Sequence, residues 1–176
     1  MFAGAAATLV LALLAATPAS RAADASLETR VKAAYIVNFL TFVDWEANGG
    51  EPAAASTRIC VLGDDAVLPL LKDLSGREVR GRPLQVVGAS KVSELRDCQL
   101  LVISRSETSR LPDVLRHVAG LNVLTVSDIP GFSRGGGVIG FVTEGDRVKI
   151  EINQRAAGEA RLRISAKLLE VARLVP

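Results

Sequence analysis

Four short apolar runs, separated by segments with helical character, are the feature of this sequence that most constrains its fold. The runs are predicted strands over residues 58–62, 82–87, 99–103 and 122–126. The segments between them include predicted helices over 66–74 and 107–119 and a helical turn over 91–95. Strands that alternate with helices in this way indicate a mainly parallel sheet with helices on its faces, a Rossmann-like α/β sandwich.

A long helix is predicted before this core. Ser26 is placed to cap a helix that runs from Leu27 to about Asp44. The residues that recur at helical spacing, and are expected on its buried face, are Leu27, Val31, Ala34, Tyr35, Asn38 and Phe42. Four more apolar residues widen that face, namely Ile36, Phe39, Leu40 and Val43.

The end of the chain predicts an antiparallel addition to the sheet. Residues 138–143 and 147–152 flank a tight connection that contains Gly145, a pattern typical of a β-hairpin. Asn153 is placed to cap a short helix to about residue 160, and Ser165 a final helix through residue 174. The expected fold is therefore an α/β domain with a mainly parallel mixed sheet and a C-terminal antiparallel hairpin.

Residues 1–22 resemble a secretory signal peptide. An apolar run over 9–16 is followed by small residues, and Ser20 and Ala22 stand at the two positions that a signal peptidase inspects. Cleavage is expected after Ala22 or up to three residues later, although no Lys or Arg precedes the apolar run. The alternative of a membrane anchor is disfavoured, because the run is too short to cross about 30 Å of hydrocarbon as a helix. We expect an exported protein whose residues 23–176 form a single α/β domain.

Two cysteines, Cys60 and Cys98, remain after the expected cleavage. An even count in an oxidising compartment favours a disulfide, which would stabilise the fold by about 4 kcal/mol in the chain-entropy model. If the two are bonded, their Cα atoms should lie about 4.4–6.8 Å apart. The alternative is two buried free thiols, since cysteine packs well as a small apolar residue.

A screen for binding and catalytic motifs excludes most chemistry. Lys and Arg number 21 against 19 Asp and Glu, and no basic cluster interleaved with aromatic residues suggests nucleic acid. Gly135, Gly137 and Gly140 fit a dinucleotide-binding spacing, but they precede a predicted strand instead of opening a helix. The single histidine, His117, has no partners at the spacing of a metal site or a catalytic triad. We expect no catalytic site, no metal and no cofactor, and therefore a non-enzymatic protein.

Polar residues follow three of the predicted parallel strands. In open α/β sheets, ligands sit outside the carboxyl ends of such strands, so a crevice for a small polar ligand is one interpretation. The alternative is that strand ends are polar simply because they meet water. The candidate crevice residues are Asp64, Ser104, Arg105, Ser127 and Asp128.

Seven stretches, in order along residues 27–175, resemble the YfiR family of periplasmic regulators. They are KAAYIVNFLTFVDW (32–45), ICVLGDD (59–65), LLVISRS (100–106), LTVSDI (124–129), IGFV (139–142), VKIEIN (148–153) and ISAKLL (164–169). The resemblance implies an α/β sandwich in the periplasm that acts by protein–protein contact. Its implied partner is the periplasmic sensor part of a membrane-anchored diguanylate cyclase, which it represses to lower cyclic-di-GMP; a homodimer is left open.

The resemblance also places particular residues. Cys60 and Cys98 fall where the family's inter-strand disulfide would be, and redox state is implicated in the family's role. A second pair found in some members is absent, because Ser133 and Gly140 occupy that region. Two aromatic residues, Phe42 and Trp45, are candidate partner contacts, with burial in the domain's own core as the alternative. The competing function is a periplasmic small-molecule-binding protein that uses the crevice.

Overall fold

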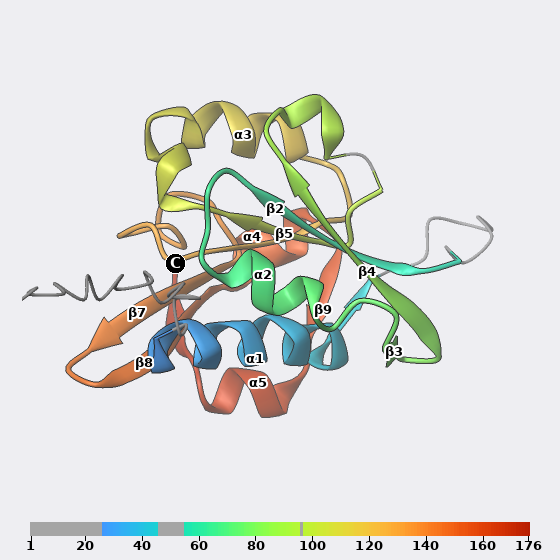
Figure 1. Ribbon diagram of the computed structural model, residues 1–176. Coiled ribbons are helices and arrows are strands. Elements are labelled where there is room, and N and C mark those ends of the chain that lie inside the picture. The colour runs from blue at the N-terminus through green and yellow to red at the C-terminus, as the bar shows by residue number, and fades with distance from the viewer. Residues whose placement is uncertain (1–25, 46–54, 96) are drawn as a thin grey trace, which may run out of the picture.

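The computed structural model describes residues 26–45, 55–95 and 97–176, and an eight-stranded mixed sheet forms its centre (Figure 1). The predicted signal peptide, residues 1–22, lies outside the described residues. The order of strands across the sheet is β10-β8-β7-β6-β5-β2-β4-β3. These strands are β2 (Thr57–Leu62), β3 (Glu78–Val79), β4 (Arg82–Ala89), β5 (Leu100–Ile103), β6 (Leu124–Ser127), β7 (Ile139–Glu144), β8 (Arg147–Asn153) and β10 (Arg173–Val175).

Helices cover both faces of the sheet. In Figure 1, α3 lies on one face, and α1, α2 and α5 lie on the other. The α-helices are α1 (Leu27–Phe42), α2 (Val67–Lys72), α3 (Leu111–Val118), α4 (Gln154–Glu159) and α5 (Ala166–Glu170). Two 3-10 helices, η1 (Val92–Glu94) and η2 (Arg105–Arg110), complete the connections. The predicted α/β class and its mixed sheet are confirmed.

β2 and β5 are parallel neighbours, but the connections that follow them lie on opposite faces of the sheet. After β2 the chain forms α2, which packs with α1 against one face through Val67 and Leu71. After β5 it forms α3, which packs against the opposite face through Val114 and Val118. A crevice opens at such a point because neighbouring connections leave the sheet in opposite directions.

Alternation along the strands builds two apolar cores. In β2, Ile59 and Val61 face α1 and α2, whereas Cys60 and Leu62 belong to the core under α3. The same period of two divides the apolar residues of β5 between the two cores. Because both faces are covered, these strands are fully apolar runs, which is typical of a parallel sheet.

The predicted hairpin is confirmed, and so are three helix caps. β7 and β8 pair antiparallel up to Glu144 and Arg147, so that Gly145 lies in a two-residue turn with a φ of 59°. Ser26, Asn153 and Ser165 each accept a hydrogen bond from the backbone N–H three residues later.

The prediction for the end of the chain was wrong beyond the first turn of its helix. α5 ends at Glu170, and the last residues form β10, which pairs parallel with β8. Three-residue strands escape detection from sequence because they are too short to show alternation. A second, two-stranded sheet was also missed: β1 (Val43–Trp45) pairs antiparallel with β9 (Leu162–Ile164).

The buried face of α1 also differs from the prediction. Leu27 is 76% exposed, and Asn38 and Ala34 are exposed, whereas Lys32 is buried. The buried residues are Lys32, Ala33, Ile36, Phe39 and Leu40. Apolar residues occur almost all round this helix, so their spacing alone does not select one stripe. The helix also ends two residues early, because Val43 is extended and begins β1.

Candidate functional site

A cavity of about 210 Å³ lies at the point where the connections change face. The loops that follow β2, β5 and β6 form its rim, and α1 closes it from one side. All five candidate crevice residues line it, namely Asp64, Ser104, Arg105, Ser127 and Asp128. These residues could be predicted from the sequence because the carboxyl ends of parallel strands meet at one edge of the sheet.

Hydrogen bonds hold the first two of these loops together. The Ser104 backbone N–H donates to the Leu62 carbonyl at 3.0 Å, and the Ser104 hydroxyl donates to the Asp64 carbonyl. The Asp64 N–H in turn donates to the Ser106 hydroxyl at 3.1 Å. Gly63 permits this approach, because its φ is +87° and a Cβ there would lie 2.8 Å from a carboxylate oxygen of Glu107.

Lys32 supplies a buried positive charge to the cavity wall. Its Nζ lies 2.7 Å from Asp128 Oδ2 and 2.6 Å from Glu28 Oε1, and its side chain is only 10% exposed. Burial alone would lower the pKa of Lys32, but the hydrogen bonds that its ammonium donates to Asp128 and Glu28 outweigh that effect and raise the pKa. Arg105 Nε lies 3.1 Å from the other Asp128 oxygen, so one carboxylate joins two cations.

Asp65 brings a third carboxyl group to the cavity, beside those of Asp64 and Asp128, and its side chain is half-buried. Its Oδ1 accepts a hydrogen bond from the Val67 N–H at 3.0 Å. Burial raises the pKa of Asp65, and repulsion from Asp128 adds to that effect. Neither Lys32 nor Asp65 was among the crevice residues predicted from the sequence. Asp65 follows β2 beside Asp64, so it was within reach of the same argument, whereas Lys32 lies within an apolar helix.

The floor of the cavity is apolar, and two serine hydroxyls in its wall are held by backbone carbonyls. The floor residues are Ile36, Val67, Val102 and Phe141. The hydroxyls of Ser104 and Ser127 donate to backbone carbonyls, of Asp64 and Ile103, so neither is paired with a base. Within the described ranges, no group of three or more His, Cys, Asp or Glu side chains is arranged to hold a metal ion. This arrangement suits reversible binding of a small molecule.

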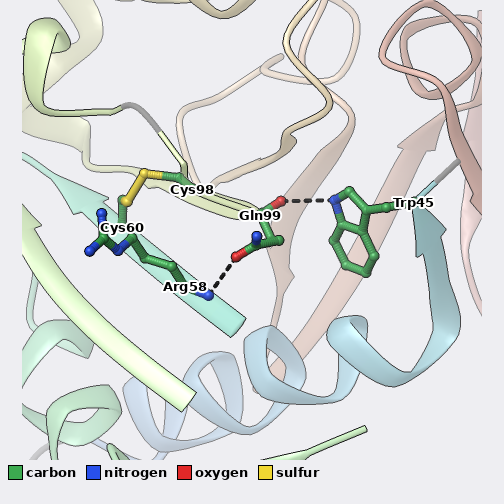
Figure 2. Close-up of a disulfide and its surroundings, with 5 residues drawn as sticks. All are labelled: Trp45, Arg58, Cys60, Cys98 and Gln99. Carbon is green, nitrogen blue, oxygen red and sulfur yellow. Dashed lines mark hydrogen bonds between the residues drawn. A yellow bond between two sulfur atoms is a disulfide. The ribbon is translucent and has the colours of Figure 1, made fainter. Parts of the chain in front are cut away.

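Cys60 and Cys98 form a disulfide on the opposite face of the sheet (Figure 2). Their Cα atoms lie 5.9 Å apart, within the range expected from sequence. Cys60 is in β2, but Cys98 precedes β5 by two residues instead of lying in the strand. Both are almost completely buried, with exposures of 0% and 4%.

The residue after Cys98, Gln99, connects the disulfide region to Trp45 at the end of β1. Gln99 accepts the Arg58 N–H on its side-chain oxygen at 2.5 Å, and its carbonyl accepts the Trp45 Nε1–H at 3.2 Å (Figure 2). Trp45 and Phe42 are half-buried and pack against the core on the α1 side of the sheet. These candidate contact residues therefore expose only part of their surface, and their role as partner contacts stays a prediction.

Comparison with known proteins gives the fold and the family. One similar solved structure is a crystal structure of an ABC domain in complex with L-Trp from Streptococcus pneumonia, with a TM-score of 0.55 and 11% sequence identity. The similarity covers 81% of this chain but only 60% of that one, and at this identity it shows the fold alone. No curated protein matches the sequence.

None of the helices in the described part of the chain has the length and apolar character that a bilayer crossing requires.

The family follows from the sequence itself. Residues 29–173 match the family model described as YfiR/HmsC-like, which confirms the resemblance carried by the seven stretches. The chain belongs to the YfiR/HmsC-like family.

Proposed function

We propose that this protein is a periplasmic regulator that binds the periplasmic part of a membrane-anchored diguanylate cyclase and lowers cyclic-di-GMP production. The observation that carries the proposal is the family match over residues 29–173, which includes nearly all of the described domain. The resemblance of residues 1–22 to a signal peptide and the pairing of two cysteines fit an oxidising compartment. Regulation by contact also fits a site without paired catalytic groups.

The mechanism that we propose is steric or conformational. A regulator of this kind needs only a different affinity for the active and inactive states of its partner. A coupling free energy of about 1–3 kcal/mol gives a 5- to 150-fold change in the equilibrium. No covalent step is required of the regulator.

The apolar groove beside α1 is the surface that we propose for this contact. It has a volume of about 810 Å³ and runs between α1, the β7–β8 hairpin and the end of α5. Two large apolar side chains at its border, Leu27 and Val171, are 76% and 69% exposed. Exposed apolar surface of this kind marks interaction sites more often than isolated apolar residues do.

Capture from solubilised membranes tests this function. The purified protein, expressed from its full-length gene, should retain a membrane protein with a diguanylate cyclase domain. The variant Leu27→Asp/Val171→Asp should lose that capture at least tenfold. Leu121→Asp is the matched control, since Leu121 is also exposed, at 40%, but follows α3 on the opposite face of the sheet. Retention of no cyclase, or equal capture by both variants, would contradict the proposal.

A second candidate function is the binding of a small molecule in the crevice. The observation that favours it is the cavity of about 210 Å³ at the point where the connections change face, with charged walls and an apolar floor. This function is compatible with the first, because a ligand that favours one state of the regulator would alter its contact with the partner. Titration of purified protein with small ligands, followed by NMR, tests it.

A further inference from the structure

We propose that the crevice binds a small organic ammonium ion, that is, a molecule with one protonated amine and a short apolar body. The inference rests on the second candidate function above and names its ligand class. Three properties of the cavity carry it: its volume, its apolar floor, and two carboxylates that have no cationic partner among the described residues.

The volume and the floor define the body of the ligand. About 210 Å³ is below the roughly 300–1,000 Å³ of pockets that hold drug-sized molecules, so the ligand is small. Side chains from α1, α2, β5 and β7 make the floor apolar, namely Ile36, Val67, Val102 and Phe141. A short hydrocarbon chain is the complement of such a floor.

The pairing of charges defines the polar end of the ligand. Lys32 is bound to both Glu28 and Asp128, and Arg105 is bound to the second oxygen of Asp128. These four groups neutralise one another. Asp64 and Asp65 are left, and no described Lys, Arg or His side chain lies within ion-pair distance of either carboxylate. A cation is therefore the complement of this wall, and the apolar floor beneath it fits an organic cation better than a hydrated metal ion.

The electrostatics at Asp65 point in the same direction. Burial raises the pKa of this carboxyl group, and repulsion from Asp128 exceeds the attraction from Lys32. The charged groups around it are Asp64 on the same loop, Lys32 on α1, and Arg105 and Asp128 beyond β5 and β6. An ammonium ion next to Asp65 would relieve this excess of negative charge. The affinity of the crevice for the ammonium ion should fall as the pH decreases through the pKa of Asp65, because protonation removes the negative charge of that carboxylate.

An anionic ligand is disfavoured by the same geometry. Arg105 is the exposed cation at the rim, but its Nε already contacts Asp128. A carboxylate that approached Arg105 would also meet Asp64, Asp65 and Asp128 along the cavity wall. The sign of the ligand charge is therefore the property to test.

Four probes of similar size separate the alternatives. Purified protein expressed from the full-length gene is titrated with pentylamine, 1-pentanol, pentanoate and norvaline at pH 7, with binding followed by amide shifts in NMR spectra. Pentylamine should bind saturably, with shifts at the cavity residues, and at least tenfold more tightly than 1-pentanol or pentanoate. Binding of pentanoate or norvaline as tight as that of pentylamine would overturn the assignment, as would saturable binding of none of the probes.

Variants then locate the binding to the two carboxylates. Asp65→Asn should weaken pentylamine binding at least tenfold. Asp73→Asn, at the exposed C-terminal end of α2, the helix that follows Asp65, should leave it unchanged. Asp64→Lys changes an exposed rim residue, so it tests the charge even if Asp65→Asn does not fold. It should weaken pentylamine binding and strengthen pentanoate binding. Unaltered pentylamine affinity in Asp64→Lys would overturn the ligand proposal. It would not contradict the proposed contact with a cyclase, because capture of the cyclase is measured separately.

Discussion

At the scale of single residues, Lys32 is the group on which the crevice wall depends. Lys32→Met preserves most of the buried volume but leaves Asp128 and Glu28 without their shared cation. Both carboxylates keep some contact with water, so we expect a loss of about 1–2 kcal/mol in the free energy of unfolding, below the cost of breaking a fully buried pair. Urea denaturation at pH 7 measures it. Lys167→Met, at an exposed lysine of α5, should change stability by less than about 0.5 kcal/mol. Equal effects of the two substitutions would contradict this role of Lys32.

Substitution of Asp65, unlike that of Lys32, should not lower the free energy of unfolding at pH 7. Its folded pKa is raised, so the native state binds more protons than the unfolded state around that pKa, and stability falls as the pH rises from about 4 through it. Asp65→Asn removes the charge and can keep the hydrogen bond from Val67. At pH 7 the variant should be as stable as the wild type or up to about 1 kcal/mol more stable. The difference should shrink towards pH 4 in urea denaturation curves. A clear loss of stability at pH 7 would show that the carboxylate serves the fold.

At the scale of secondary-structure elements, the disulfide fixes the start of β5 against β2. Its loop spans a sequence separation of 38, so Cys60→Ala/Cys98→Ala should lower the free energy of unfolding by about 4 kcal/mol in the chain-entropy model. Because both sulfurs are buried, dithiothreitol should reduce the folded protein far more slowly than protein in urea. Fluorescence of Trp45, the only tryptophan, monitors the reduction, because its indole N–H donates a hydrogen bond to the carbonyl of Gln99, next to Cys98. Rapid reduction without denaturant would contradict a structural role and favour a redox switch.

The elements that could be predicted from the sequence are those with a strong local pattern. Strands and helices alternate clearly from residue 58 to residue 126, because each buried strand is bounded by polar turns. The polar residues at the ends of three of these strands predicted the position of the crevice. β1, β9 and β10 each contain three residues, so they depend on pairing with distant strands instead of on local pattern. The burial of Lys32 depends on Asp128, 96 residues away, and no helical periodicity contains that information.

At the scale of the whole molecule, a proposed partner surface and a proposed ligand crevice lie on one domain. α1 contributes to both, because Glu28 borders the apolar groove while Lys32 lines the crevice. The two side chains are ion-paired at a spacing of four residues. A ligand that alters the crevice therefore acts on the helix that also forms the proposed contact surface. The proposed regulatory output, a lower level of cyclic-di-GMP, can be measured without knowing any ligand.

Measurement of cellular cyclic-di-GMP after clean deletion of the gene tests the proposed repression. Under conditions in which the partner cyclase is expressed, deletion should raise cyclic-di-GMP, and the full-length gene supplied in trans should restore the original level. A form that lacks residues 1–22 should not restore it, because it would remain on the wrong side of the membrane. An unchanged cyclic-di-GMP level in the deletion strain, with the cyclase present, would contradict repression of the cyclase by this protein.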